Sequence, residues 1–402
     1  MKYFNIFDPV TNATTSAGLS NEMKTYYSDY LIDFAKPQLV HNQFGQKQTI
    51  PANNGKTVEF RKYSPLAKAT ELVEGVDGDG KAMTVGTVTA TVKQYGDYIK
   101  MTDVLLLTAI DNNLVQAVEL LGDQAGRTLD TVIREVINAG TNVQYGANAV
   151  TARHLLVGGE SSGNHYMNVD TIRRAVRCLR AKNAKTIDGK NYVGIIHPDV
   201  SYDLMSDPKW ESVSEYAEPE NWFAGEIGRI GGVRFVETTE AKIFHADALA
   251  DTALAVNKAD GYTGAITAIK FDGATVASNA LKGRKILING VVATVSSNTA
   301  DTITVPSTNF GTVADNTAIY AGEAGAKGRD VYSTLVLGAN AYGVIDVAGG
   351  GLQTIVKDKS QAGSFLDLYA TAGWKALSAG AILEDNFMVR VETACTFESG
   401  AN

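Results

Sequence analysis

The longest periodic pattern in the chain is an apolar stripe between residues 111 and 138. Its apolar residues recur every three or four positions, which is the period of one face of an α-helix. Asp111 or Asn112 can cap the start of this helix, and Gly140 follows its end. At about 1.5 Å per residue the predicted helix is a rod of roughly 40 Å. The stripe consists of Leu114, Val118, Leu121, Ala125, Leu129, Val132 and Val136.

Two strand patterns precede this helix, at residues 56–63 and 84–101. Both alternate polar residues with apolar or β-branched ones, which is typical of β-strands. The residues between them include three glycines and four acids. The pattern predicts a long hairpin-like arm with an acidic tip. Such an arm has little core of its own, so we expect a neighbouring molecule to cover its apolar side. The four acids are Glu71, Glu74, Asp77 and Asp79.

The second half of the chain predicts an α/β region interrupted by a β-rich module. Residues 257–330 are rich in Ala, Thr and Gly and have strand-like patterning. Within them Asn289-Gly290 joins two apolar runs, which is typical of a hairpin with a type I′ turn. The fold class predicted is therefore α+β with an inserted β-rich module. Helices are expected at 170–181 and 200–205, and strands at 192–196, 233–237, 331–337, 365–370, 373–379 and 387–393.

Composition excludes several classes of protein. The net charge of −8 argues against a protein that grips nucleic acid over its whole surface, although not against one that encloses it. No apolar run approaches the roughly 18 residues of a membrane span, and the first residues do not resemble a signal peptide. Cys178 and Cys395 are isolated, and the five histidines have no metal-binding spacing. We expect no metal, no cofactor and no membrane partner.

Two short motifs raise the alternative of an enzyme. Residues 159–163, Gly-Glu-Ser-Ser-Gly, match the pattern around the nucleophile of many serine hydrolases. No helix pattern follows at once, and His165 is too near in sequence to serve as the expected base. Residues 75–82 nearly match a phosphate-binding loop, but Ala82 lacks the hydroxyl that would hold Mg²⁺. We interpret the first motif as a polar turn and expect no enzyme, with a hydrolase using Ser161 as an alternative.

Charged residues provide candidate contacts between copies of the chain. Three arginines share one face of the predicted helix 170–181, which favours either a patch facing DNA or another subunit, or a solvated face paired with acids. The acidic tip can meet either this helix or the basic pair on strand 56–63 of a neighbour. The candidate assembly contacts are Arg61, Lys62, Glu71, Glu74, Asp77, Asp79, Arg173, Arg177 and Arg180.

Several stretches carry a family resemblance through their order along nearly the whole chain. They are Tyr30–Pro37, Gly45–Pro51, Gly55–Arg61, Gly231–Glu237, and Gly373–Leu377 followed by Phe387–Val391. Together they resemble the major capsid proteins of tailed bacteriophages with the Hong Kong 97-type fold, in particular the coat-protein family of phage N-four. None is a catalytic motif. Residues 257–330 depart from the resemblance because they make the chain longer than the family core.

The resemblance implies a division of the chain into named parts. The long helix becomes the spine of a P-domain, and the hairpin arm becomes an extended E-loop. The parts are an N-terminal arm (1–55), the E-loop (56–100), the P-domain (101–165 and 365–402), the A-domain (166–256 and 331–364) and the inserted β-rich module (257–330).

The function implied is that of a coat. The resemblance implies self-assembly into pentamers and hexamers that form an icosahedral shell around double-stranded DNA. It also implies scaffolding, portal and decoration proteins as possible partners, and a virion assembled in the cytoplasm of a bacterial host. An encapsulin-like protein compartment shares this fold and is the structural alternative. A surface or adhesive β protein is a third class, suggested only by residues 257–330.

Overall fold

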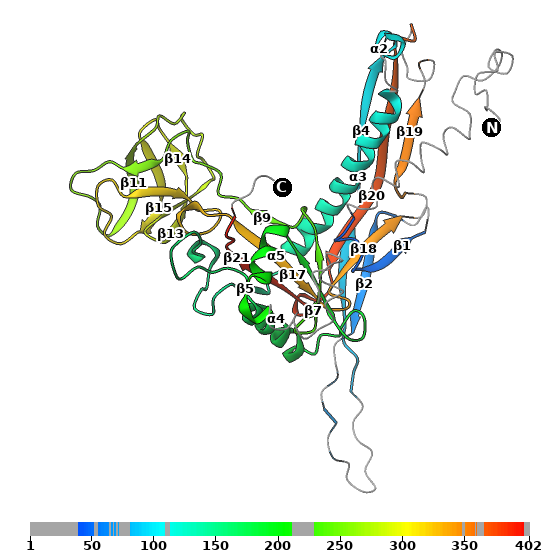
Figure 1. The fold of residues 1–402 in the computed structure, drawn as a ribbon, viewed down its shortest axis with the longest axis horizontal. Coiled ribbons are helices and arrows are strands. Elements are labelled where there is room, and N and C mark those ends of the chain that lie inside the picture. The colour runs from blue at the N-terminus through cyan, green and yellow to red at the C-terminus, as the bar shows by residue number, and fades with distance from the viewer. Residues whose placement is uncertain are drawn as a thin grey trace, which may run out of the picture. The chain divides into compact units, whose positions relative to one another are not determined.

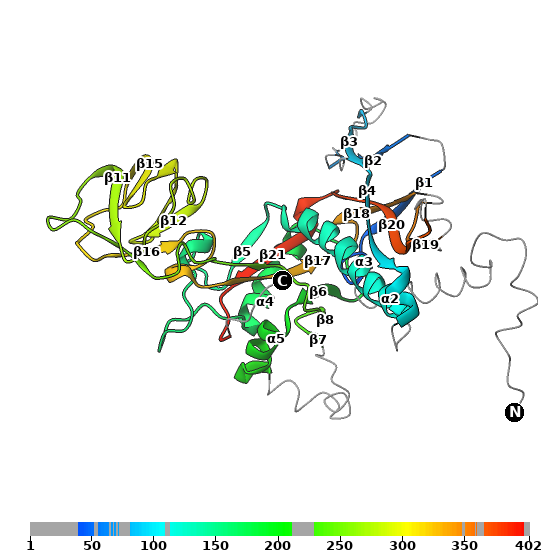
Figure 2. The same ribbon diagram turned by 90° about the horizontal axis from the view of Figure 1, so that it is seen from above.

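The computed structural model describes residues 39–51, 55–63, 66, 68–69, 71, 81–108, 113–210, 229–347, 350–357, 359 and 366–397. The chain divides into two compact units (Figures 1 and 2). Unit 1 contains Met1–Ile133 and Gly343–Leu383, and unit 2 contains Arg134–Tyr342 and Glu384–Asn402. The predicted helix caps Asp111 and Asn112 lie outside the described residues.

Unit 1 is built on a five-stranded sheet in the order β1–β18–β20–β19, with β4 paired to β20 as well. The strand β20 is continuous, so the prediction of separate strands at 365–370 and 373–379 is wrong. Gly373 lies inside it because a side chain there would meet the Cβ atom of Tyr98 at 2.7 Å. The strands are β1 (Gln46–Ile50), β4 (Lys93–Thr102), β18 (Tyr342–Val347), β19 (Gln353–Lys357) and β20 (Tyr369–Ile382).

The predicted long helix is confirmed as α3 (Asn113–Asn138), which follows the short α2 (Asp103–Thr108). Its apolar face is shifted in the last two turns. Ile133 and Ile137 are buried there, whereas the predicted Val132 and Val136 are only half-buried. From Arg134 onward the helix belongs to unit 2. The core of unit 1 that includes the helix comprises Met101, Ala117, Val118, Leu121, Ala125, Leu129, Val356, Ala372, Trp374 and Ala376.

The predicted hairpin arm is confirmed as β2 (Thr57–Tyr63) paired antiparallel with β3 (Val85–Thr91). The second predicted strand, 84–101, breaks only at the buried Val92, which separates β3 from β4. Phe60 anchors the base of the arm, and its ring packs so closely on Gly343 that no Cβ would fit there. The arm is therefore anchored at its base. The other residues of this core are Ile50, Val58, Ala90, Val92, Ile345, Ala379 and Ala381.

Unit 2 contains a mixed sheet in the order β5–β21–β17–β6–β8–β7, with β9 beside β17. The helices α4 (Val169–Ala181) and α5 (Pro198–Met205) confirm the two helices predicted there, and apolar residues of both belong to the core cluster that includes this sheet. The pairing of β6 with β8 is parallel. The strands are β5 (Val143–Tyr145), β6 (Tyr192–Ile196), β7 (Arg229–Ile230), β8 (Val233–Glu237), β9 (Ile243–Phe244), β17 (Val331–Leu337) and β21 (Met388–Thr393).

A second seven-stranded sheet in unit 2 has the order β13–β12–β16–β10–β11–β15–β14. Among the residues that the structure describes, its hydrophobic core cluster contains only members of this stretch of chain, Leu249 to Ile319. Asn289 and Gly290 both have positive φ, at 49° and 74°, which confirms the type I′ turn. The strands are β10 (Leu254–Val256), β11 (Ala265–Asp272), β12 (Lys285–Ile288), β13 (Val291–Thr294), β14 (Ser297–Asn298), β15 (Thr302–Asn309) and β16 (Ala318–Ala321).

Candidate functional site

The outer half of the hairpin arm presents apolar side chains to solvent. Tyr63 and Val85 lie directly opposite each other on β2 and β3, and both are exposed. Leu66 and Met83, just beyond this pair, are also exposed, with 60% and 66% of their surface accessible. A cluster of large apolar side chains on a two-stranded arm is unstable in water unless another surface covers it.

The sheet of unit 1 has one covered and one open face where β4, β20 and β19 lie side by side. Tyr95, Ile99 and Trp374 point to the face that packs on α3. Because successive side chains of a strand alternate between faces, Tyr98 and Lys100 belong to the opposite, open face. Tyr98 has 67% of its surface exposed.

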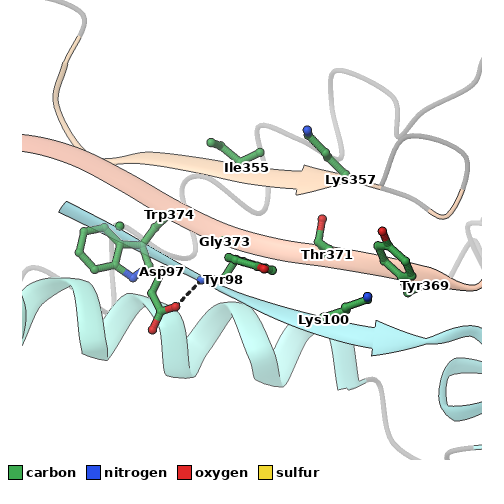
Figure 3. A pocket seen from close by; sticks show the side chains of 10 residues that line it. Asp97, Tyr98, Lys100, Ile355, Lys357, Tyr369, Thr371, Gly373 and Trp374 are labelled. Atoms are coloured by element: carbon green, nitrogen blue, oxygen red, sulfur yellow. Dashed lines mark hydrogen bonds between the residues drawn. The ribbon is translucent and has the colours of Figure 1, made fainter. Parts of the chain in front are cut away.

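A groove of about 520 Å³ runs along this open face (Figure 3). Its floor is β20, where Gly373 has Tyr98 beside it on β4 and Ile355 beside it on β19. Since glycine carries no side chain, the middle of this row is hollow. In the next row Lys100 and Lys357 flank Thr371 on either side.

The groove is basic. Lys100 places its Nζ 3.5 Å from the centre of the Tyr369 ring, a favourable cation–π contact. Lys357 and Lys375 add two further ammonium groups to the same face, as the alternation of the strands requires. The residues of β4, β19 and β20 that point to this side include no carboxylate.

Asp97 borders the groove, but its carboxylate forms a hydrogen bond with α3 on the covered side of the sheet. Gln124 of α3 donates to Asp97 Oδ2 at 2.8 Å, and the backbone N–H of Tyr98 donates to Oδ1 at 2.8 Å. These hydrogen bonds, the one from Gln124 first, lower the pKa of Asp97. The indole of Trp374 donates to the other end of the Gln124 amide at 3.1 Å. The Asp97 side chain thus points to the helix side of the sheet and away from the open face (Figure 3).

The predicted assembly residues fall in three places. Arg61 and Lys62 are exposed on β2, and Glu71 is exposed beyond the described end of that strand. Glu74, Asp77 and Asp79 lie outside the described residues. The arginines of α4 belong to unit 2, where Arg173 lies 3.8 Å from Asp170. The face they share is exposed, and it comprises Arg173, Arg177 and Arg180.

The groove itself was not predicted from the sequence. Its wall depends on β19, and the Gln-Thr-Ile-Val-Lys run of that strand was not assigned as a strand. Tyr98 and Lys100, two residues apart on β4, are the one signal that was available, but alternation alone does not tell which face of a sheet is covered.

Ser161 lies in an exposed polar turn. Residues 159–162 form bends, and the next helix, α4, begins only at Val169, so the strand–turn–helix context of a nucleophile elbow is missing here. The Nδ1 atom of His165 accepts a hydrogen bond from the Val157 N–H at 3.0 Å. Glu160 forms an ion pair with Lys327 at 2.6 Å. The turn is held by polar contacts of its own.

Metal-binding clusters and membrane-spanning helices are both absent from the described ranges. Within them, no group of three or more His, Cys, Asp or Glu side chains is placed to hold a metal ion. None of the helices in the same ranges has the length and apolar character needed to cross a membrane.

One part of the chain resembles a known protein family, and nearly the whole chain resembles solved structures. Residues 84–241 match the family model of a phage capsid protein. No curated protein matches the chain. Three solved phage capsids share its fold at 12–13% identity.

The capsid of Ralstonia phage GP4 has a TM-score of 0.57, 13% identity and coverage of 100% of both chains. The capsid asymmetric unit of cyanophage Pam1 has a TM-score of 0.56 and 12% identity, and covers 99% of this chain and 100% of that one. The capsid of cyanophage P-SCSP1u has a TM-score of 0.52 and 12% identity, with 89% and 88% covered. Residues 84–241 therefore resemble the phage capsid protein family, and the chain has the fold of solved phage capsids.

Proposed function

We propose that this chain assembles with itself into pentamers and hexamers, which close into an icosahedral shell around double-stranded DNA. The proposal is supported most directly by the exposed apolar side chains of the hairpin arm. Its base is anchored in the core of unit 1, whereas Tyr63, Val85, Leu66 and Met83 stay exposed. Such a surface gains burial only against another subunit, and many weak contacts repeated around a shell act together.

The parts of the chain are assigned in the same proposal. The hairpin β2–β3 supports an E-loop within residues 56–100, and α3 supports a spine helix in a P-domain of residues 101–165 and 365–402. An N-terminal arm of residues 1–55 precedes them. The sheet of unit 2 supports an A-domain of residues 166–256 and 331–364, and the second sheet supports an inserted module of residues 257–330.

The contents and partners of the shell follow from charge and chemistry. A chain of net charge −8 does not adhere strongly to DNA, so the shell encloses double-stranded DNA without reading its sequence. Scaffolding, portal and decoration proteins are the proposed partners, and the cytoplasm of the bacterial host is the proposed place of assembly. The exposed turn around Ser161 supports a structural protein and not an enzyme.

The alternative of an encapsulin-like compartment uses the same fold with protein cargo. The two functions differ in what the particle contains. Purified particles that protect double-stranded DNA from added nuclease support the capsid, whereas particles that contain only protein support the compartment.

Polar replacement of the exposed apolar pair tests the role of the arm. The variant Tyr63→Ser/Val85→Ser changes no buried residue, so we expect a chain that unfolds at the wild-type temperature but forms few particles. The matched control is Tyr320→Ser, an exposed aromatic in the second sheet of unit 2. Particle yield is measured by sedimentation. Wild-type yield from the arm variant would contradict the proposed role of the arm.

A further inference from the structure

We propose that one end of unit 2, here called the basic end, binds the phosphate backbone of double-stranded DNA and so faces the inside of the shell. This inference rests on the proposed function, because a shell filled with DNA presents that ligand to its inner wall. It goes beyond the proposed function by naming the residues that meet the DNA. The basic end consists of Arg173, Arg177 and Arg180 of α4 and of Arg229 and Arg234 of the β7–β8 hairpin.

The fold brings these arginines together from two separate stretches of chain. The β7–β8 hairpin lies beside α4 in unit 2 (Figure 1). Its turn is Gly231-Gly232, where the Cβ position of Gly231 lies 3.9 Å from Arg173 Cγ and that of Gly232 lies 3.1 Å from Arg180 Nη2. Since β7 is the last strand of its sheet, the arginines of the helix and those of the hairpin meet around one edge of that sheet.

The three arginines of α4 form a regular row. They stand four and three residues apart, which places them on one face of the helix, and all three are exposed. At about 1.5 Å per residue the row spans about 10 Å, which is also the axial rise of three phosphates on one DNA strand at about 3.4 Å each. A planar guanidinium can bind a phosphate through two parallel hydrogen bonds. The row therefore suits the backbone of a DNA strand in both spacing and chemistry.

The hairpin contributes two arginines whose arrangement favours a bound anion. Arg229 and Arg234 are direct partners across β7 and β8, and both are exposed. Like charges directly opposite each other destabilise an antiparallel pair of strands. Asp188 lies 3.8 Å from Arg234, but both side chains of this pair are exposed, so the pair contributes little. A phosphate between the two guanidinium groups removes the repulsion.

The basic end has few acids of its own. Within the described residues, Arg177, Arg180 and Arg229 form no ion pair. The one carboxylate on α4, Asp170, is already paired with Lys209. On a chain of net charge −8, this local excess of positive charge indicates a polyanion as the partner. Exposed lysines in the loop that joins α4 to β6 extend the same surface, and they are Lys182, Lys185 and Lys190.

An acidic protein segment is the rival occupant. Residues 211–228 contain five glutamates and no basic residue, and they directly precede Arg229 in the sequence. We favour DNA because its phosphates are evenly spaced along a stiff duplex, as the arginines are along α4, whereas the carboxylates of a peptide have no such fixed spacing. The second experiment below distinguishes the two occupants.

DNA binding by the purified, unassembled full chain tests the basic end. The fluorescence anisotropy of a short labelled duplex is measured over a series of salt concentrations, starting at low salt. We expect Arg177→Gln/Arg180→Gln to weaken binding at least about tenfold and to lower the salt slope by about two phosphate contacts. The matched control is Lys270→Gln/Lys282→Gln, which removes two exposed charges from the second sheet of unit 2 and should bind like the wild type. A wild type that does not bind the duplex, or equal binding by the two variants, would overturn the proposal.

Photo-cross-linking in purified particles identifies the occupant directly. An amino acid that carries a diazirine replaces Arg177 in one variant and the exposed Lys282 in the other. After irradiation, the chains are separated and tested for attached DNA and for linked peptides. We expect DNA on the chain that carries the probe at position 177 and little on the control. Links from position 177 only to residues 211–228 or to another protein, or equal DNA attachment at both positions, would contradict a DNA site.

The outcomes separate this inference from the proposed function. If particles form and contain DNA, but neither duplex binding nor DNA attachment depends on the basic end, the inference is wrong and the function as a shell stands. If no particles form, the proposed function fails. Duplex binding by the unassembled chain then still decides whether the basic end binds DNA.

Discussion

Glu392 shows how a single buried charge holds unit 2 together. It is fully buried, and its two carboxylate oxygens accept hydrogen bonds from Arg153 at 2.7 and 2.8 Å. Arg390 donates to the same carboxylate at 2.8 Å, and the guanidinium of Arg153 stacks on Phe244 at 3.3 Å. The network ties the turn before Leu156 to β9 and β21.

Removing this charge should be costly. The variant Glu392→Gln leaves two guanidinium groups without their carboxylate, and we expect it to lower the free energy of unfolding by about 3–5 kcal/mol. The matched control is Asp123→Asn, whose ion pair with Arg127 is exposed at 3.8 Å and is worth at most about 0.5 kcal/mol. Urea unfolding of the unassembled chain measures both. Equal effects would contradict the role given to Glu392.

His197 makes the stability of unit 2 depend on pH. Burial lowers the pKa of His197, against the weaker opposing effect of the Asp199 and Glu237 carboxylates. Its Nδ1 accepts the Asp199 N–H at 3.2 Å and so caps α5 in the neutral form. Because the folded pKa lies below the unfolded value of 6.5, the unfolded chain takes up the proton first as pH falls. Stability is therefore fully present above that value and is lost below it.

The variant His197→Asn separates this effect from other acid effects. Asparagine can also cap a helix but does not titrate, so we expect a flatter fall in stability between about pH 7 and pH 5 than in the wild type. The two proteins should differ little in this slope above about pH 7, where the histidine is neutral in both states. Urea midpoints across this range measure the difference. Parallel curves from pH 7 to pH 5 would show that His197 does not contribute.

At the scale of elements, the close approach of β4 and β20 depends on Gly373. A Cβ atom there would lie 2.7 Å from the Cβ of Tyr98 and 2.9 Å from the Asp97 carbonyl oxygen. We expect Gly373→Ala to lower the free energy of unfolding by about 1–3 kcal/mol, because the strands must move apart. Gly351→Ala is the control, since nothing lies within 4 Å of its Cβ position, and it should change stability by less than about 0.5 kcal/mol. Thermal unfolding of the two variants measures the difference. Equal midpoints would show that the close approach of β4 and β20 does not depend on Gly373.

The elements that the sequence predicted are those with a strong local signal. The helix α3, the alternation of β2 and the Asn289-Gly290 turn each depend on neighbouring residues alone, and the structure confirms them, although the buried face of α3 shifts to Ile133 and Ile137 in its last turns. The break predicted between the strands 365–370 and 373–379 is wrong because β20 pairs through it with β4, which is distant in sequence. The groove was missed for the same reason, since its three strands meet only in the folded chain.

At the scale of the whole molecule, the second sheet of unit 2 is a candidate for independent folding. Within the described residues, its core cluster consists of side chains between Leu249 and Ile319. Its two ends meet where β9 pairs with β17, and Asp330 binds both His245 and the Ala246 N–H at 3.0 Å. The chain therefore enters and leaves the module at one place.

A fragment of residues 247–325 should fold without the rest of the chain. We expect strand-rich circular dichroism and a cooperative thermal transition, because the fragment retains its entire hydrophobic core. The matched control is the same fragment carrying Ile286→Ala, a fully buried core residue, which should melt earlier by the equivalent of about 2–5 kcal/mol. A fragment without a transition would show that the module depends on its surroundings.

The central claim is that this chain builds a closed shell from copies of itself. It is tested most directly by sedimentation and electron microscopy of the purified full chain, expressed alone and with the genes that neighbour its own. The account predicts closed icosahedral particles, or rings of five and six subunits, with the hairpin arm ordered against a neighbour. A stable monomer of 42.8 kDa under both conditions would contradict it.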